Sequence, residues 1–189
     1  PTLLIMMSGF TRIVMVLSFM RNALGLQQTP PNQVLVGLAL FLTLFVMSPI
    51  LHQINEEAYT PYTEGEITQQ QALDKAIVPV RTFMLKQTNN NDLNLFIGLS
   101  DMERPQSLEE IPTEIIVPAF ITSELRRAFI IGFLIFLPFL IIDMVVASVL
   151  MSMGMVMLPP VMISLPFKII LFVLVDGWGL IVRSLITSF

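Results

Sequence analysis

The stretch QVLVGLALFLTLFVMSPIL, residues 33–51, decides the fold class because its 19 residues include no charged side chain. As an α-helix it would be about 28 Å long, close to the thickness of the hydrocarbon core of a bilayer. The whole chain agrees with this: 54% of its 189 residues are hydrophobic and 13% are charged, whereas globular proteins carry about 25% charged residues. The sequence therefore predicts an all-α membrane-type protein.

Three further apolar stretches carry ionisable residues. Residues 3–20 contain Arg12 and are followed by Arg21, which would lie on the opposite face of a helix, so we expect protein on several sides of this helix. Two C-terminal stretches contain Asp143 and Lys168. An ionisable group at membrane depth costs from about 2.5 kcal/mol upward unless it faces protein or water. Neither C-terminal stretch is therefore expected to be an ordinary lipid-facing helix.

A polar insert separates two apolar blocks. Residues 52–117 carry eleven acidic and four basic side chains, a net charge of −7, whereas the rest of the chain has a net charge of +3. We divide the chain into an N-terminal hydrophobic helical block (1–51), a helical insert (52–117) and a C-terminal hydrophobic helical block with a Met-rich loop (118–189). Cytoplasmic loops are enriched in Lys and Arg, so the acidic insert is expected on the periplasmic side. The predicted fold is thus two apolar helical hairpin blocks separated by a small helical periplasmic subdomain.

The insert contains its own helix-forming pattern. Thr68 and Gln71 have the spacing of a capping box. The apolar residues that follow recur at helical spacing: Ala72, Leu73, Ala76, Ile77, Val80, Phe83 and Met84. The asparagines at 89–91 are expected to end this helix. The apolar stripe is predicted to pack within the insert or against a sister subunit rather than to bind a ligand.

The stretch MSMGMVMLPPVM, residues 151–162, places methionine at every second position, at Met151, Met153, Met155 and Met157. This period does not keep side chains on one face of a helix, and it suits an extended segment or a turn. Gly154, Pro159 and Pro160 are the expected hinge or turn residues. Methionine is flexible and polarizable, so the segment suits a soft channel seal, and the alternative is a Met-rich helical hairpin tip packed in an apolar interior.

Asp143 and Lys168 lie at similar distances on either side of this Met-rich segment, so a chain reversal would bring them to matching depths. We predict that they form a buried charge pair, either within the hairpin or between neighbouring subunits. The pair suits a static salt bridge, and a proton relay is the alternative. Asp176 and Arg183 are seven residues apart and form a second candidate pair on one helical face.

The residue inventory excludes several classes of function. A net charge of −4 is unfavourable for nucleic acid, which requires a basic surface. The chain has no cysteine and a single histidine, His52, so no zinc site, no other metal site and no thiol catalysis are expected. No phosphate loop, dinucleotide motif or intramembrane protease motif occurs, so no catalytic residue and no cofactor are predicted. A conduit or structural membrane component remains, and the alternative is a secondary transporter or proton channel that uses Asp143 and Lys168.

Two long segments resemble one known family. They are GFTRIVMVLSFMRNALGLQQTPPNQVLVGLALFLTLFVMSP (9–49) and PAFITSELRRAFIIGFLIFLPFLIIDMVVASVLMSMGMVMLPPVMISLPFKIILFVLVDGW (118–178). Both resemble the FliP family, the export-gate proteins of the flagellar type III secretion apparatus. The region between them corresponds to the variable region of such proteins, so the resemblance covers nearly the whole chain.

This resemblance implies a core subunit of the export gate, forming a closed channel through which unfolded flagellar proteins are exported. It implies a location in the bacterial inner membrane, in the flagellar basal body. It implies assembly of about five copies with the smaller subunits FliQ and FliR, in contact with other flagellar export and basal-body proteins, unfolded protein substrates and membrane lipid. The family's methionine-rich loop lines the narrowest part of the channel, and this role carries over to Met151, Met153, Met155 and Met157. A cleaved signal peptide is also implied, and the chain starts at Pro1, so we expect a preceding segment to have been removed.

Overall fold

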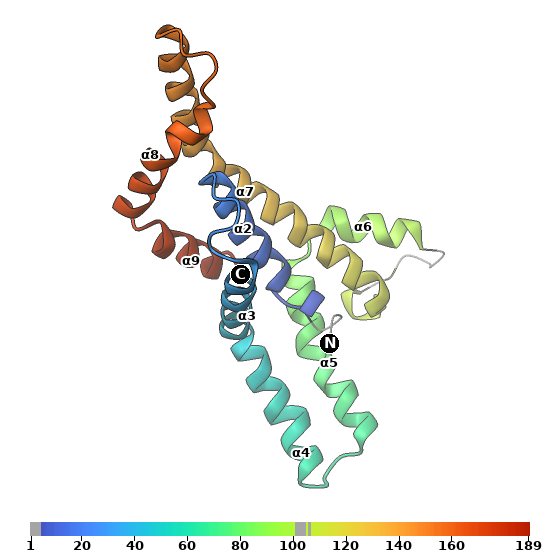
Figure 1. Cartoon of the computed structure of the whole chain (residues 1–189). Helices are drawn as coiled ribbons and strands as arrows, with labels where there is room; N and C mark the ends of the chain where they lie inside the picture. The colour runs from blue at the N-terminus through green and yellow to red at the C-terminus, as the bar shows by residue number, and fades with distance from the viewer. Residues whose placement is uncertain (1–4, 101–104, 106) are drawn as a thin grey trace. The chain divides into compact units, whose positions relative to one another are not determined.

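The structure is a computed structural model that describes residues 5–100, 105 and 107–189 (Figure 1). Its α-helices are α2 (Phe10–Ala23), α3 (Asn32–Ile54), α4 (Thr60–Thr63), α5 (Gln69–Gln87), α6 (Asn90–Leu99), α7 (Thr113–Ser152), α8 (Pro160–Leu174) and α9 (Gly177–Thr187). A π-helical turn, η1 (Asn55–Tyr59), joins α3 to α4, and a 3-10 turn, η2 (Leu108–Glu110), precedes α7. The described residues form no β-strand, so the predicted all-α fold is confirmed.

Two helical segments are long and apolar enough to cross a membrane. The first is the continuous segment Asn32–Thr63, and the second is Thr113–Ser152, the whole of α7. Helices α8 and α9 meet at a bend of 64° and count as a third candidate span if they are taken together. These lengths and compositions agree with the predicted membrane-type protein.

The chain divides into two compact units. The first contains Pro1–Arg12 and Leu40–Arg127, and the second contains Ile13–Ala39 and Ala128–Phe189. The chain passes from one unit to the other inside α2, α3 and α7. The division of the sequence into 1–51, 52–117 and 118–189 is based on charge and hydropathy, and it stays a prediction.

In the first unit, α5 begins where the sequence predicts. The Thr68 side chain accepts a hydrogen bond from the Gln71 backbone N–H at 3.4 Å, and the Gln71 side chain accepts one from the Thr68 N–H at 2.9 Å. This reciprocal pair satisfies two N–H groups that have no partner within the helix. The helix ends at Gln87, and Asn89 then caps α6 by accepting a hydrogen bond from the Asn91 N–H at 2.9 Å. Both helix boundaries expected from the sequence are thus confirmed.

A buried polar centre holds the helices of the first unit together. Arg12 of α2 is fully buried and forms an ion pair with Glu124 of α7, which is fully buried as well. The Arg12 guanidinium also donates to Gln87 Oε1 at 3.1 Å, and Arg127 donates to the same oxygen. Burial lowers the pKa of Arg12, and the hydrogen bond and negative charge of Glu124 oppose that shift.

A second polar cluster in the same unit fixes α6 against α7. Asp92 is buried and accepts hydrogen bonds from the Ser123 hydroxyl at 2.7 Å and from the Arg126 guanidinium at 2.5 Å. The Ser123 oxygen in turn accepts from the backbone N–H of Asn89 at 2.9 Å. The sequence SELRR at 123–127 therefore supplies polar partners to three different helices. Because the Arg126 side chain is 52% exposed, its removal costs less than the roughly 3–5 kcal/mol expected for a fully buried partner.

The second unit packs α2 closely against α7. Gly132 permits this approach, because a Cβ atom at this position would come within 2.5 Å of the Phe19 ring. The same ring contacts Phe129, with ring centroids 5.0 Å apart. Val16, Leu17 and other apolar residues of α2 are fully buried here. Small residues at a helix contact let two backbones approach, as they do in membrane helix pairs.

A fixed bend separates α8 from α9. Asp176 adopts the left-handed conformation, with φ of +51°, and its side chain caps α9 by accepting from the Gly179 N–H at 3.4 Å. Trp178 packs edge-on against Phe172 with ring centroids 5.6 Å apart. Asp176 is thus the N-cap of α9, the helix that contains Arg183, and the pairing of these two residues stays a prediction.

Candidate functional site

The Met-rich segment forms the turn of a helical hairpin made by α7 and α8. The Gly154 N–H bonds to the Met151 carbonyl at 3.0 Å, and the Met155 N–H bonds to the Leu150 carbonyl at 2.9 Å. With Gly154 at φ of +76°, this is the Schellman arrangement that ends many helices, and it needs a residue without a Cβ atom at that position. Pro160 is the first residue of α8, where a missing N–H group has no cost.

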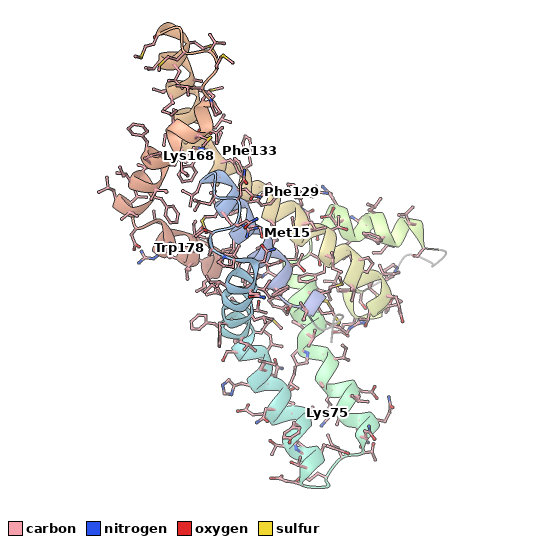
Figure 2. All side chains as sticks on the ribbon, in the orientation of Figure 1. Met15, Lys75, Phe129, Phe133, Lys168 and Trp178 are labelled. Atoms are coloured by element: carbon pink, nitrogen blue, oxygen red, sulfur yellow. The ribbon has the colours of Figure 1, made fainter. Side chains whose placement is uncertain are left out.

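The methionines of this turn are exposed. Met151 lies in the last turn of α7, whereas Met153, Met155 and Met157 lie in the non-helical segment between the helices. All four side chains are exposed, and Met157 is 99% exposed. Figure 2 shows yellow sulfur atoms at the end of the α7–α8 hairpin. The helix therefore ends within the alternating methionines, after Met151, and their role as a channel gasket stays a prediction.

The structure brings Asp143 and Lys168 together below the turn. Lys168 on α8 is 2% exposed, and its ammonium group lies 2.7 Å from Asp143 Oδ2 on α7. The Ser164 hydroxyl donates to the other carboxylate oxygen of Asp143. Lys168 also donates to the carbonyl oxygen of Ala23, the last residue of α2, at 3.3 Å. The pair lies within one chain and joins both arms of the hairpin to α2.

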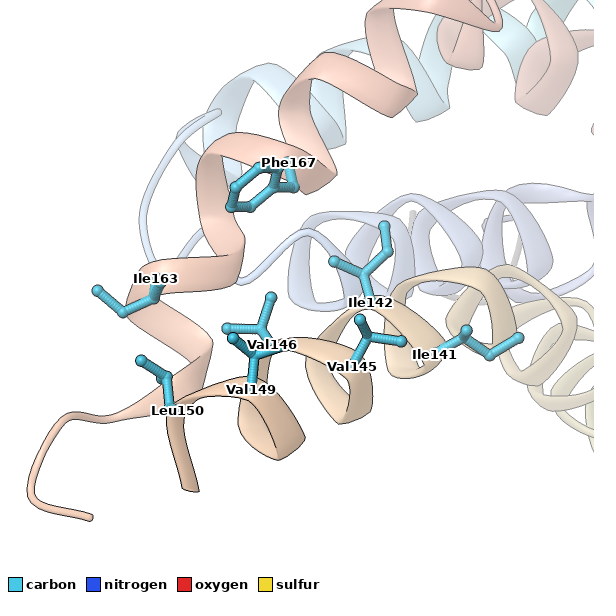
Figure 3. A pocket seen from close by; sticks show the side chains of 8 residues that line it. All are labelled: Ile141, Ile142, Val145, Val146, Val149, Leu150, Ile163 and Phe167. Carbon is cyan, nitrogen blue, oxygen red and sulfur yellow. The ribbon is translucent and has the colours of Figure 1, made fainter. Parts of the chain in front are cut away.

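The two arms of the hairpin also enclose an apolar groove (Figure 3). Its volume is about 510 Å³, and its lining contains aliphatic and aromatic side chains of α7 and α8: Ile141, Ile142, Val145, Val146, Val149, Leu150, Ile163 and Phe167. The absence of polar side chains in the lining gives no means to orient a polar substrate. The groove is therefore an apolar surface formed by both arms of the hairpin.

No group of acidic, histidine and cysteine side chains in the described residues could hold a metal ion. Sequence reasoning missed the pairing of Arg12 with Glu124 and the cluster around Asp92. Arg12 and Glu124 are 112 residues apart, and no spacing rule connects them. The cost of burying Arg12 did indicate that a partner exists, although it could not identify Glu124.

Comparison with known proteins identifies the family. The model of the FliP family matches residues 1–185. The chain belongs to the FliP family. It is similar over its whole length to the flagellar biosynthetic protein FliP of Bacillus subtilis (strain 168), with 62% identity and 86% of that protein covered. FliP of Pectobacterium carotovorum subsp. carotovorum is 56% identical over the whole chain with 73% covered, and FliP of Borreliella burgdorferi is 53% identical with 76% covered.

Membership of the FliP family makes the α7–α8 hairpin part of a flagellar biosynthesis protein. FliP proteins are named as flagellar biosynthesis components and are not a known enzyme family. The site consists of exposed thioethers on a turn, anchored by a charge pair, which is not the arrangement of an acid–base pair around a substrate pocket.

Proposed function

We propose that the chain is a core subunit of the export gate of the flagellar type III secretion apparatus in the bacterial inner membrane. About five copies assemble with FliQ and FliR into a closed channel through which unfolded flagellar proteins are exported. Other flagellar export and basal-body proteins and membrane lipid surround this assembly. The single observation that carries the proposal is the exposed methionine turn on an anchored hairpin of a FliP-family chain.

The methionine turn supplies the channel seal. Met151, Met153, Met155 and Met157 from each copy converge into a ring of apolar side chains that excludes ions. Methionine has three rotatable side-chain bonds, so such a ring yields when a polypeptide pushes through and closes again afterwards. Gly154, Pro159 and Pro160 fix the shape of the turn, and the Asp143–Lys168 pair fixes the depth of the hairpin.

The alternative function is a secondary transporter or proton channel that uses Asp143 and Lys168. The hydrogen-bonding pattern favours the static role, because Ser164 and the Ala23 carbonyl occupy further hydrogen-bonding positions of the pair. A transporter would work as a small unit with a polar substrate site, whereas a gate subunit would be inert until it assembles.

Passive ion leak tests the gasket. Replacing both Met155 and Met157 with alanine should raise membrane conductance severalfold, because two apolar side chains per copy are lost from the narrowest ring. Whole-cell conductance or ion-sensitive growth measures this effect. Met144→Ala, an exposed methionine of α7 outside the turn, is the matched control and should leave the leak unchanged. If the double variant and the control leak equally, the turn has a packing role only and does not seal the channel.

A further inference from the structure

The sulfur atoms of this chain are distributed unevenly. The sequence has 13 methionines and no cysteine, so every sulfur atom is a thioether. Four methionines are buried in the units, with exposed fractions of 8% or less: Met7, Met20, Met47 and Met84. Five exposed methionines gather in the 12 residues around the α7–α8 turn: Met151, Met153, Met155, Met157 and Met162.

This distribution decides where an oxidant would react. A thiol reacts according to its pKa, but a thioether has no proton to lose, so access to the sulfur atom controls its rate of oxidation. Without cysteine in the chain, no faster-reacting thiolate competes for the oxidant. Among the described residues, five of the seven exposed methionines lie at this one turn, and the other two are Met6 and Met144.

We propose that Met151, Met153, Met155, Met157 and Met162 form a site of reversible oxidation to methionine sulfoxide by peroxides. In the reaction with hydrogen peroxide, a sulfur lone pair attacks one peroxide oxygen and the O–O bond breaks. The leaving hydroxide takes the proton of the transferred oxygen and becomes water. Sulfur loses two electrons to the peroxide, which is reduced. Methionine sulfoxide reductases reverse the change, so the site can switch in both directions.

The fold tolerates this modification at the turn. The exposed methionines contribute little to the core, and the turn is fixed by backbone hydrogen bonds and by Gly154, none of which involves sulfur. The anchor below the turn consists of Asp143, Lys168 and Ser164, which contain no sulfur either. Oxidation at Met20 or Met84 would instead place a polar oxygen in a fully buried position.

Oxidation would change the seal. A sulfoxide oxygen is a strong hydrogen-bond acceptor, so a ring of sulfoxides would hold water where a ring of thioethers excludes it. This consequence rests on the proposed function of the turn as a channel gasket. Peroxide would then raise ion leak through the gate, and reduction would restore closure.

Peptide mapping by mass spectrometry tests the site itself. Native membranes containing the full chain are exposed to hydrogen peroxide, and the fraction of sulfoxide at each methionine is followed over time. We expect Met153 and Met157 to oxidise at least about tenfold faster than Met20 and Met84, because access controls the rate. The chain unfolded in guanidinium is the control, and its methionines should react at similar rates. Similar rates in the native chain, or protection of the turn, would overturn the proposal.

Ion leak tests the consequence separately. For each variant, the leak after peroxide is divided by its own leak before treatment. The native chain and Met144→Leu should show a severalfold rise that a methionine sulfoxide reductase reverses. The variant in which Met151, Met153, Met155, Met157 and Met162 are all replaced with leucine should show no rise, since leucine has no sulfur. The same relative rise in this leucine variant would overturn the switch but leave the gasket intact. If the double replacement of Met155 and Met157 with alanine does not raise the ion leak, the gasket is refuted. The oxidation site would then still be tested by the peptide mapping alone.

Discussion

Lys168 joins three helices through one ammonium group. It extends from α8, pairs with Asp143 of α7 at 2.7 Å, and donates to the carbonyl of Ala23 at 3.3 Å. The Ala23 carbonyl is among the last four of α2, which have no partner inside that helix and carry the negative end of its dipole. One buried cation therefore compensates both a carboxylate and a helix terminus. Such a group is hard to replace with any neutral side chain.

Charge exchange between Asp143 and Lys168 tests this anchor. Each single change, Asp143→Lys or Lys168→Asp, should destabilise the subunit by an amount near the lower end of about 3–5 kcal/mol, since the Asp143 side chain is 27% exposed. The double exchange should recover part of this loss, but not all, because an aspartate on α8 cannot donate to the Ala23 carbonyl. Thermal unfolding of the detergent-solubilised assembly measures the effect.

Arg183→Ala provides the matched control for the loss of a charge. Arg183 is exposed on α9, so this change should alter stability by no more than about 0.5 kcal/mol. Normal thermal unfolding of both single variants would refute the anchor. Full recovery in the double exchange would refute the role of the Ala23 carbonyl.

Helix α5 uses only part of its apolar stripe within its own unit. Phe83 and Met84 are buried, and Phe83 packs against Phe120 of α7 with ring centroids 6.0 Å apart. Leu73 of the stripe is 59% exposed, and Val78, a neighbouring apolar residue outside the stripe, is 54% exposed. A stripe that is buried at one end and exposed at the other is typical of a helix that is completed by another chain.

Aspartate at Leu73 or Val78 is expected to dissociate the oligomer and leave the subunit folded, because these side chains have few intramolecular contacts to lose. Aspartate at Phe83 is expected to unfold the first unit itself, because a charge would be buried against Phe120. Size-exclusion chromatography and thermal unfolding together separate the two outcomes. Lys75→Glu, on the exposed side of α5, is the control and should leave the oligomer intact. An intact oligomer with aspartate at both Leu73 and Val78 would contradict the packing role.

At the scale of the whole molecule, the charge distribution predicts the orientation of the chain. Residues 52–117 carry a net charge of −7, and the candidate spans Asn32–Thr63 and Thr113–Ser152 extend into this region from both sides. The acidic region therefore follows one span and precedes the other. Since translocated loops carry few basic residues, we propose that this region is periplasmic.

Single cysteines test the orientation in a chain that has none of its own. Gln70, Lys86 and Ser107 are exposed, so a cysteine at each should react with a membrane-impermeant thiol reagent added outside spheroplasts. Thr88 is unsuitable, because it is buried and its hydroxyl donates to the Met84 carbonyl at 2.7 Å. A cysteine at Met84, which is fully buried, is the control and should stay unlabelled until the protein is denatured. Labelling from the cytoplasmic side alone would reverse the topology.

The amino-acid sequence by itself determined the features that depend on local chemistry. Helix α5 begins directly after Thr68 because a capping box needs only two residues three positions apart, and α7 ends before Gly154 because the left-handed conformation favours glycine. The apolar spans follow from the length of an uncharged run compared with the thickness of a bilayer. These properties are set within a few residues or by composition, so pattern and spacing are enough to find them.

Only the tertiary structure decided which distant residues meet. The pairing of Arg12 with Glu124, the cluster of Asp92 with Ser123 and Arg126, and the contact of Lys168 with the Ala23 carbonyl all join segments that are far apart along the chain. The cost of a buried charge indicates that a partner exists, but several carboxylates satisfy that requirement equally well in a sequence. Packing chooses one partner among several because it fixes the direction and depth of each helix, and neither quantity is encoded in local spacing.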